Sequence, residues 1–522
     1  MNLPDRYAER FDEYFDVVVV GYGFAGAAAA IEAHDHGARV LLIEKMAAPG
    51  GISICAGGGL RIGNDPDKVF AYLEAANAGT TPPEIHRAFA AGMAELKAYF
   101  ERLAEVDGAR IVLREREGNY PFAGHDSLCF LEVESIPGFD AGRDYPHAHS
   151  LRAGPNVFKL VDDNVRHRGI EVRLSTPALR LITGPANDVR GVWVRSTRGL
   201  QAIGARRAVV LCCGGFENAA DLHSQFWQLR PVLPVASRGN TGDGVRMAQD
   251  LGAALWHMWH YHGSYGFRHP DPAFPFGIRM KRLPDWTPGS TPPRARMSWI
   301  ALGRDGRRFM NEYHPYLQDT GHRPLDQYDP ALQRFPYVPA YVVVDDAGRG
   351  MYPLGKATFN DPDVEIYSWS DDNLREVELG ILRRAESVEA LAALIGVDAA
   401  VLRATLTRWN EACAAGVDTD FQRPGETMVP VATPPFFVGE IWPVVSNTQG
   451  GPVHNARQQV LNAFGGPIPR LYEAGELGGM WGFLYLSGGN LSECFVGGRI
   501  AGRDAAQLAP WDATAAAKNA AS

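Results

Sequence analysis

The segment 15–45 constrains the fold of this chain more than any other part of the sequence. It reads FDVVVVGYGFAGAAAAIEAHDHGARVLLIEK, with two apolar runs on either side of a glycine turn and an alanine-rich stretch. The β-branched run over 17–20 is typical of a strand buried on both faces of a parallel sheet, and the run over 39–43 repeats the pattern before an acid. The pattern predicts a strand, a tight turn, a helix and a second strand.

The turn between these strands has the glycine spacing of a dinucleotide site. Gly21 permits the tight turn, Gly23 lets a pyrophosphate approach the backbone, and Gly26 lets the helix pack closely against the strand. Glu44 is placed to accept hydrogen bonds from a ribose diol. The predicted contacts also include Phe24, Ala25 and Lys45. This segment alone leaves open which dinucleotide binds.

Composition excludes several classes of protein. With 522 residues the chain exceeds what one core usually supports, so we expect two or more domains. A formal charge of −9 gives no basic footprint for nucleic acid, and no apolar run reaches the length of a membrane span. With a charged start unlike a signal peptide, these features predict a cytoplasmic protein without a membrane span. The six cysteines form no CxxC pair and the histidines over 257–262 lack companion ligands, so no metal site is expected.

Three further glycine-rich segments follow predicted strands. They are PGGISICAGGG at 49–59, RRAVVLCCGGFEN at 206–218 and NTGDG at 240–244. Clustered glycines let a flat or anionic group lie close to the backbone, although a flexible loop is the alternative for the first segment. Together the segments favour a flavin protein over a simple NAD dehydrogenase. The predicted cofactor contacts here are Gly50, Gly51, Ser53, Gly57, Gly58, Gly214, Gly215, Asn240 and Asp243.

Between these motifs, periodicity predicts helices over 65–107 and 157–166 and strands over 170–174, 179–182 and 189–194. The segment 118–155 is rich in Gly, Pro and His and shows no clear period, so we assign it no structure.

With these motifs the chain resembles a known flavoprotein family. The remaining motifs are GRDGRRFMNE at 303–312, WNEACAAGVD at 409–418, and GE at 475–476 leading to SGGNLSECFVGGRIAG at 487–502. The family includes the succinate dehydrogenase and fumarate reductase flavin subunits and the 3-ketosteroid dehydrogenases. The resemblance implies bound FAD, with a helix N-terminus that stabilises the reduced flavin. It adds Gly475, Glu476, Asn490 and Leu491 to the expected contacts.

The resemblance also implies a fold and a domain organisation. The fold class is α/β, with a Rossmann-like FAD-binding domain of the glutathione-reductase type. This domain is discontinuous, over 1–275 and 440–510, and an inserted α+β substrate-capping domain covers 276–439. The alanine-rich residues 511–522 are expected to form a flexible tail.

Departures from the family pattern narrow the function. Where some members attach FAD to a histidine, this chain has Ile52, so FAD should be noncovalent. Fumarate reductases hold a dicarboxylate with a histidine before a Thr-x-Gly-Gly turn and an arginine before Gly-Gly-Asn. Those places read VSNTQGG at 445–451 and LYLSGGN at 484–490, so both charged partners are missing. A small-acid substrate stays open because of the nearby arginines, which are Arg294, Arg296, Arg307 and Arg308.

Tyr485 and Ser487 stand just before the last glycine pair, as in the ketosteroid dehydrogenases that form a 4-ene. The second tyrosine of that family matches Tyr316, with Tyr313 as the alternative. Desaturating a ketone needs a donor to the carbonyl and a base for the α-proton, and one tyrosine suits each role. For Tyr485 the alternative is an ordinary buried tyrosine. An aromatic-lined pocket suits a cyclic substrate, and the candidates are Trp286, Trp299, Trp442, Trp481 and Phe483.

The sequence therefore predicts an FAD-dependent dehydrogenase that forms a C=C bond next to a ketone in a cyclic substrate, such as a 3-ketosteroid. An external electron acceptor is required. The first alternative is a reductase or dehydrogenase of an unsaturated or small carboxylic acid. The second is a flavin-bearing electron-transfer subunit, which the missing FAD-attaching histidine disfavours. Monomer and homo-oligomer both remain open.

Overall fold

The computed structural model describes residues 3–115, 117–280, 296–313 and 322–512. The first segment folds as its pattern predicts, into β1 (Glu13–Val20), α1 (Phe24–Asp35) and β2 (Val40–Ile43). The two strands are parallel, with Val17 opposite Val40 and Val20 opposite Ile43. Every residue of β2 is buried, as expected of a strand covered on both faces.

The first sheet contains eight strands in the described part of the chain, and its centre is parallel. Strands β25, β10, β1, β2 and β7 run parallel, in that order. An antiparallel strand, β24, extends one edge, and β8 and β9 form an antiparallel meander with β10. The bounds are β7 (Glu171–Arg173), β8 (Ala178–Thr183), β9 (Val189–Ser196), β10 (Gly199–Leu211), β24 (Gln459–Leu461) and β25 (Pro467–Glu473).

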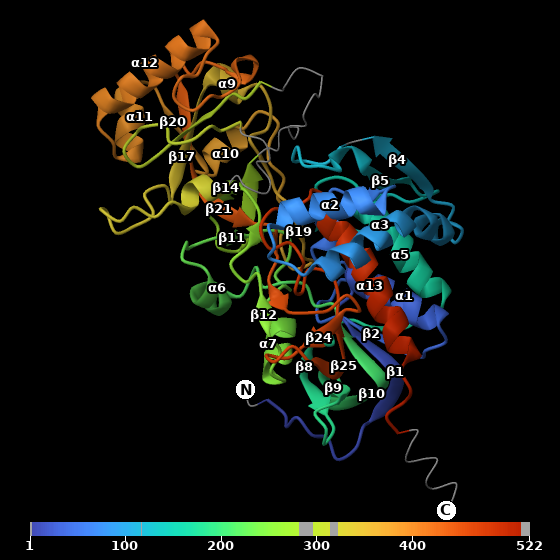
Figure 1. Cartoon of the computed structure of the whole chain (residues 1–522). Coiled ribbons are helices and arrows are strands. Elements are labelled where there is room, and N and C mark those ends of the chain that lie inside the picture. Colours follow the sequence, from blue (N-terminus) through green and yellow to red (C-terminus); the bar gives the residue numbers. More distant parts are fainter. Residues whose placement is uncertain (1–2, 116, 281–295, 314–321, 513–522) are drawn as a thin grey trace, which may run out of the picture.

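Helices from both ends of the chain cover this sheet. Helix α13 (Gly489–Gln507) lies beside α1, as Figure 1 shows in red and blue. Their close approach depends on small residues, since a Cβ on Gly502 would lie 2.3 Å from the carbonyl oxygen of Ala29. The other helices of this half are α2 (Pro66–Asn77), α3 (Pro83–Ala104), α4 (Ala141–Asp144), α5 (Gly154–His167), α6 (Ala220–Phe226) and α7 (Asp243–Asp250).

The segment 118–155, which the sequence left unassigned, contributes one strand to a three-stranded antiparallel sheet. The order of this sheet is β3 (Gly59–Gly63), β5 (Leu128–Ser135) and β4 (Arg110–Glu115). Leu128, Leu131 and Val133 of β5 are buried in the main hydrophobic cluster. No period is visible in this segment because a single eight-residue strand stands between glycine- and proline-rich turns.

A second eight-stranded sheet forms the other half, among the described residues. Its central strand, β21 (Phe436–Val445), pairs antiparallel with β17, β14 and β20. The other strands are β11 (Leu233–Pro234), β14 (Tyr265–Arg268), β15 (Gly277–Met280), β16 (Ile300–Leu302), β17 (Ala340–Asp345), β18 (Gly355–Lys356) and β20 (Leu382–Ala385). Its helices are α9 (Asp346–Arg349), α10 (Leu374–Glu378), α11 (Val388–Ile395) and α12 (Ala399–Ala415).

Three short strand pairs lie between the halves. They are β12 (Leu255–Trp256) with β23 (Gly451–Pro452), β13 (Tyr261–His262) with β22 (Asn447–Thr448), and β6 (Ala148–His149) with β19 (Phe359–Asn360). Each joins segments far apart in sequence.

The whole is a mixed α/β fold, as predicted, with the two sheets at opposite ends of the molecule (Figure 1). Within the described ranges, no single helix is long and apolar enough to cross a membrane. Helices α11 and α12 meet that criterion only as a pair, with a bend of 117° between them.

Candidate functional site

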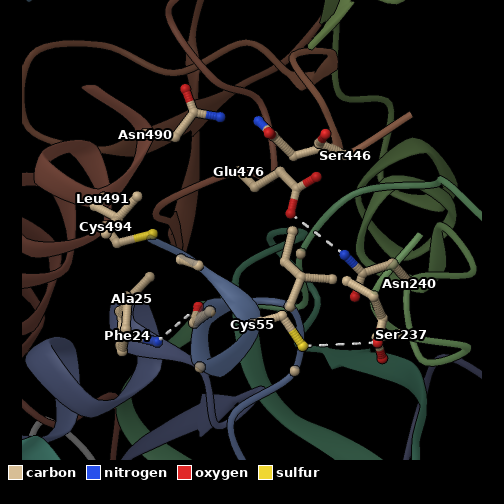
Figure 2. Close-up of a pocket in the computed structure, with 18 of the residues that line it drawn as sticks. Phe24, Ala25, Cys55, Ser237, Asn240, Ser446, Glu476, Asn490, Leu491 and Cys494 are labelled. Carbon is tan, nitrogen blue, oxygen red and sulfur yellow. Dashed lines mark hydrogen bonds between the residues drawn. The ribbon is translucent and has the colours of Figure 1, made fainter. Parts of the chain in front are cut away.

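A cavity of about 920 Å³ lies between the first sheet, the start of α13 and the second sheet. Its walls are formed by the segments that follow β1, β2 and β10, together with residues 485–494. Ligands of parallel α/β sheets bind outside the carboxyl ends of the strands, and the cavity has this position. Figure 2 shows Phe24 and Ala25 on one side and Asn240, Ser446 and Glu476 on the other.

The glycine turn after β1 is shaped by close backbone contacts. Gly21 has a φ of +106°, and a Cβ there would lie 2.2 Å from the carbonyl oxygen of Cys212. A Cβ on Gly26 would lie 1.9 Å from the carbonyl oxygen of Gly21. Both positions therefore require glycine, and the first residues of α1, Phe24 and Ala25, line the cavity directly after the turn.

Glu44 is held at the end of β2 by main-chain donors. Its Oε2 accepts from Tyr22 N–H at 2.9 Å, and its Oε1 accepts from Met46 N–H at 2.8 Å. Burial raises the pKa of Glu44, although these two hydrogen bonds oppose the shift. The side chain is thus fixed on the cavity wall with lone pairs left for hydroxyl donors.

We expect Glu44→Gln to weaken FAD binding by about 10–100-fold. The side-chain amide of glutamine would place an N–H against a main-chain N–H, where Glu44 has an acceptor oxygen, so the side chain would lose its fixed position. Titrating the apoprotein with FAD and following flavin fluorescence gives the dissociation constant. The control is Glu13→Gln, whose carboxylate binds Arg173 at the start of β1. An unchanged FAD affinity in a correctly folded Glu44→Gln protein would contradict the predicted role.

Lys45 and Asp243 form an ion pair at the same end of the cavity. Lys45 Nζ lies 2.6 Å from Asp243 Oδ2 and also donates to Thr241 Oγ1 at 2.6 Å. Asp243 is the first residue of α7 and accepts from Thr241 Oγ1–H at 2.9 Å. The pair joins the turn after β2 to the start of α7. It therefore helps to fix the position of these two parts of the cavity wall.

Glu476 belongs to a buried cluster of carboxyl groups. Thr448 N–H donates to Glu476 Oε1 at 2.8 Å, and Asn240 Nδ2–H donates to Glu476 Oε2 at 3.3 Å (Figure 2). Glu217 shares the Thr448 donor at 3.3 Å. Burial, followed by the neighbouring Glu217 carboxyl, raises the pKa of Glu476 well above its ordinary value. A protonated Glu476 can donate one hydrogen bond, which the neighbouring Glu217 carboxyl can accept.

The start of α13 offers donors to a flat, electron-rich group. Gly488 is the N-cap, with φ +78°, and Asn490 and Leu491 follow on the cavity wall. Both amide atoms of Asn490 are buried and have no hydrogen-bond partner among the described residues. A flavin ring presents carbonyl and ring nitrogen groups that would satisfy such an amide, so these residues fit FAD.

Most predicted FAD contacts line this one cavity. The lining includes Gly21, Gly23, Phe24, Ala25, Glu44, Lys45, Gly51, Ser53, Gly57, Gly58, Gly214, Asn240, Asp243, Glu476, Asn490 and Leu491. Gly26, Gly50, Gly215 and Gly475 lie behind it, packed against other protein groups. Phe24 N–H donates to Ser53 Oγ at 3.3 Å, which joins the first turn to the glycine loop.

Tyr485 and Ser487 also line this cavity. The Tyr485 hydroxyl oxygen accepts from Gly488 N–H at 3.0 Å, and its ring packs edge-on against Trp481. Tyr316 lies outside the described residues. Tyr313 is buried in the hydrophobic cluster of the second sheet.

His262 stands beside Tyr485 and was not singled out by the sequence as a site residue. The two ring centroids are 4.2 Å apart, and both residues line the cavity. His262 Nδ1 lies 2.9 Å from Asn447 Oδ1. An amide oxygen only accepts, so this contact requires the proton on Nδ1, and in that tautomer Nε2 is the basic nitrogen of the neutral ring.

Arg61 fixes the turn that carries these residues. It is 1% exposed, and its Nε–H donates to the Ser487 carbonyl at 3.0 Å. Its main-chain N–H donates to the Gly488 carbonyl at 3.1 Å, and its guanidinium lies 3.9 Å from the Phe130 ring centroid. This clamp holds the position of Tyr485 relative to α13.

Among the described residues, none of the arginines of the small-acid alternative lines the cavity. Arg308 Nη2 is 2.7 Å from Glu312 and 3.0 Å from Asp418, inside the second half. Arg307 is exposed beside Asp305, Arg296 donates to the Met428 carbonyl, and Arg294 lies outside the described residues. Arg279 of β15 does line the cavity, where it donates to Ser446 Oγ and to Thr358 Oγ1. The segment that carries Arg279, GIRM at 277–280, matches no binding motif that sequence alone would reveal.

The aromatic residues expected around the substrate are distributed differently. Trp299 and Trp481 are buried in the hydrophobic cores, Trp442 stacks with Arg268, and Phe483 is 39% exposed. Trp286 lies outside the described residues. The rings that line the cavity near Tyr485 are Phe130 and His262.

Comparison with known proteins identifies the family. The model of the FAD binding domain family matches residues 16–491. The chain belongs to this family. It is 27% identical over 500 residues to a fumarate reductase (cytochrome) from Shewanella frigidimarina, covering 94% of this chain and 77% of that protein.

Two solved structures share the fold of this flavoprotein. A 3-ketosteroid delta1-dehydrogenase from Sterolibacterium denitrificans has a TM-score of 0.78 at 23% identity, covering 95% of this chain and 99% of the other. A 3-ketosteroid-delta4-(5alpha)-dehydrogenase from Rhodococcus jostii has a TM-score of 0.66 at 22% identity, covering 96% and 98%. The resemblance found in the sequence is confirmed, and the protein is an FAD-dependent oxidoreductase.

Proposed function

We propose that this flavoprotein oxidises a CH–CH bond next to a ketone in a cyclic substrate, forming an α,β-unsaturated ketone. The observation that carries the proposal is Tyr485, which lines the cavity with its hydroxyl held by the N–H of Gly488 at the start of α13. This phenol lines the same cavity as the glycine turn and Glu44. Substrate and cofactor can therefore occupy one continuous space.

The residues of this chain would handle the proton. A phenol that accepts an N–H bond can still donate its own O–H to a carbonyl, and polarising that carbonyl makes the α-proton acidic. Its loss requires a base, for which Tyr316 is the family-based candidate. His262 is a second candidate, because its ring packs on Tyr485 and its Nε2 is the basic nitrogen.

FAD, when bound, accepts the β-hydrogen as hydride and passes the electrons to an external acceptor. We infer that it binds noncovalently, since Ile52 stands where some relatives attach it. The cavity residues Glu44, Asn240, Glu476 and Asn490 are proposed to hold it. Tyr485 and the first turn of α13 would exclude water from the reacting carbons.

A discontinuous domain organisation accompanies this proposal. The parallel order β25, β10, β1, β2 supports a Rossmann-like, glutathione-reductase-type FAD-binding domain built from 1–275 and 440–510. The strands β15 to β18 and β20 support a substrate-capping domain over 276–439. The cavity is lined from both proposed domains.

A second candidate is a reductase of an unsaturated carboxylic acid. Arg279 favours it, because a guanidinium on the cavity wall can bind a carboxylate through two parallel hydrogen bonds. This arginine comes from β15, whereas the charged positions of fumarate reductases read as Asn447 and Leu486 in this chain.

Anaerobic mixing of the purified flavoprotein with a panel of substrates decides between the two candidates. We expect saturated cyclic ketones to bleach the flavin absorbance and to give an unsaturated ketone by mass spectrometry. The opposite result is bleaching by a reductant followed by reoxidation with an unsaturated acid, while no cyclic ketone reacts. That result would replace the first candidate by the second.

A further inference from the structure

One side-chain amide in the cavity wall has a donor that the described part of the chain leaves unused. Asn447 lines the cavity and is 8% exposed. Its Oδ1 contacts His262, whereas its Nδ2 is buried and has no hydrogen-bond partner among the described residues. Buried polar groups are nearly always paired, and leaving one unpaired costs about 1–3 kcal/mol. An amide N–H of this kind on a cavity wall therefore indicates a ligand oxygen.

The main chain holds Asn447 in place on both sides. Strands β13 and β22 pair antiparallel, with His262 directly opposite Asn447. Ser446 N–H donates to the His262 carbonyl at 2.7 Å, and Thr448 N–H donates to Glu476 Oε1 at 2.8 Å. The side chain is fixed in addition by the contact of its Oδ1 with His262 Nδ1 at 2.9 Å. A donor held in this way needs no reorganisation when a ligand arrives.

The imidazole of His262 connects this amide to the proposed reaction centre. Its ring packs on the ring of Tyr485, with centroids 4.2 Å apart, and its Nδ1 contacts Asn447. All three residues line the cavity. The phenol and the amide therefore flank the same ring on one stretch of wall, where a ligand oxygen can meet both.

A neutral amide donor suits a ketone that is losing its α-proton. A carbonyl oxygen has two lone pairs and can accept two hydrogen bonds at once. As the proton leaves, negative charge develops on this oxygen, and each hydrogen bond to it becomes charge-assisted and stronger. A donor that gains strength during the reaction lowers the barrier more than one that binds the substrate equally well throughout.

We propose that Asn447 is a second donor to the substrate ketone, so that Asn447 Nδ2–H and the Tyr485 O–H bind the same oxygen. When the α-C–H bond breaks, the proton goes to the base. The electron pair of that bond forms the enolate C=C bond, and the carbonyl π pair moves to the oxygen between the two donors. The β-hydrogen then leaves as hydride, which FAD accepts, and the carbonyl re-forms. The inference rests on the proposed function for the ketone, but the donor role of Asn447 is a separate claim.

The test uses a phenol in which an aromatic ring replaces the ketone-bearing ring, because its deprotonated oxygen imitates the enolate oxygen. We expect it to bind the FAD-loaded enzyme as the phenolate, seen as long-wavelength charge-transfer absorbance. Asn447→Asp and Asn447→Ala should each weaken this binding by about 10–100-fold, the scale of a charge-assisted hydrogen bond. The first variant keeps the acceptor for His262 but adds a charge, whereas the second adds no charge. What they share is the loss of the N–H.

Turnover of a cyclic ketone should fall in the same two variants by about 100–1,000-fold, the scale of a lost oxyanion donor. The loss should appear mainly in kcat, because the hydrogen bond is strongest in the transition state. The matched control is Asn462→Asp, at a residue that does not line the cavity and whose Oδ1 accepts from Phe464 N–H at 2.8 Å. It should change neither turnover nor phenolate binding. Flavin absorbance and circular dichroism establish that each variant is folded and loaded with FAD.

Phenolate binding separates this inference from the proposed function. If no ketone is oxidised but phenolate binding is weakened in both Asn447 variants, the proposed oxidation fails and the donor role stands. A wild type that binds no phenolate, or equal binding by wild type and Asn447→Ala, overturns the donor role. Weakening confined to Asn447→Asp also overturns it, since charge repulsion alone would then explain the effect.

Discussion

Tyr485→Phe is expected to lower turnover of a cyclic ketone by at least ~100-fold, the usual scale for a lost acid–base group. The variant lacks only the hydroxyl that accepts from Gly488 N–H and would donate to the ketone. The ring, and its packing against Trp481 and His262, remain. Bound FAD should therefore be unchanged, which the flavin absorbance of the purified protein measures.

The control for this variant is Tyr367→Phe. Tyr367 is a buried tyrosine in the second half whose hydroxyl donates to Glu376 at 2.9 Å. Its loss should affect stability but leave turnover close to that of the wild type. Near-normal turnover in Tyr485→Phe would rule out the proposed role and leave Tyr485 as a structural residue.

The second large effect is expected on stability, from Arg308→Met. The side chains of Glu312 and Asp418 are 0% and 1% exposed, and Arg308 contacts both. Removing the cation leaves buried carboxylates without their main partner, which costs about 3–5 kcal/mol. Urea unfolding followed by fluorescence measures the loss. The control is Arg307→Met next to it, an exposed arginine whose replacement should cost under ~0.5 kcal/mol.

The pH dependence of this difference follows from the two acids. Burial alone would raise the pKa of Glu312, but the charge and hydrogen bonds of Arg308 outweigh burial and hold that pKa below its usual value. The same balance lowers the pKa of Asp418. A lowered folded-state pKa gives stability that is present above the unfolded pKa and lost as pH falls through the folded one. The gap between wild type and Arg308→Met should therefore be full near pH 7 and shrink below about pH 4.

A stable Arg308→Met protein with lost activity would contradict this assignment. It would return Arg308 to the small-acid alternative that the sequence left open. We expect the reverse, because the side chain is enclosed by Glu312, Asp418 and the ring of Trp409.

The sequence predicted the parts of the candidate site that are formed by residues close together in the chain. The turn at Gly21, the acid at Glu44 and the start of α13 each lie within one strand–turn–helix unit, where backbone sterics decide the conformation. Strand β5 was missed because a lone strand between irregular loops carries no periodic signal long enough to recognise.

Arg279 and His262 could not be predicted in the same way. Each comes from a short strand, and what matters is which distant residues it meets: Ser446 for Arg279, and Asn447 and Tyr485 for His262. Such pairings depend on tertiary packing, which one sequence does not encode in any local pattern. The sequence also kept a small-acid substrate open because of the arginines at 294, 296, 307 and 308. In the structure, Arg308 is paired with Glu312 inside the second half.

The contact between α1 and α13 has a consequence for the order of events during synthesis. Residues 24–35 leave the ribosome long before the wall formed by Gly488, Asn490, Leu491 and Cys494, which is made after every described strand of both sheets. Until β25 is made, the last residues of β10, Val209 to Leu211, lack their partner on one side. The N-terminal half therefore exposes apolar surface and a short unpaired strand edge during synthesis, and the proposed FAD cavity is complete only once the start of α13 is in place.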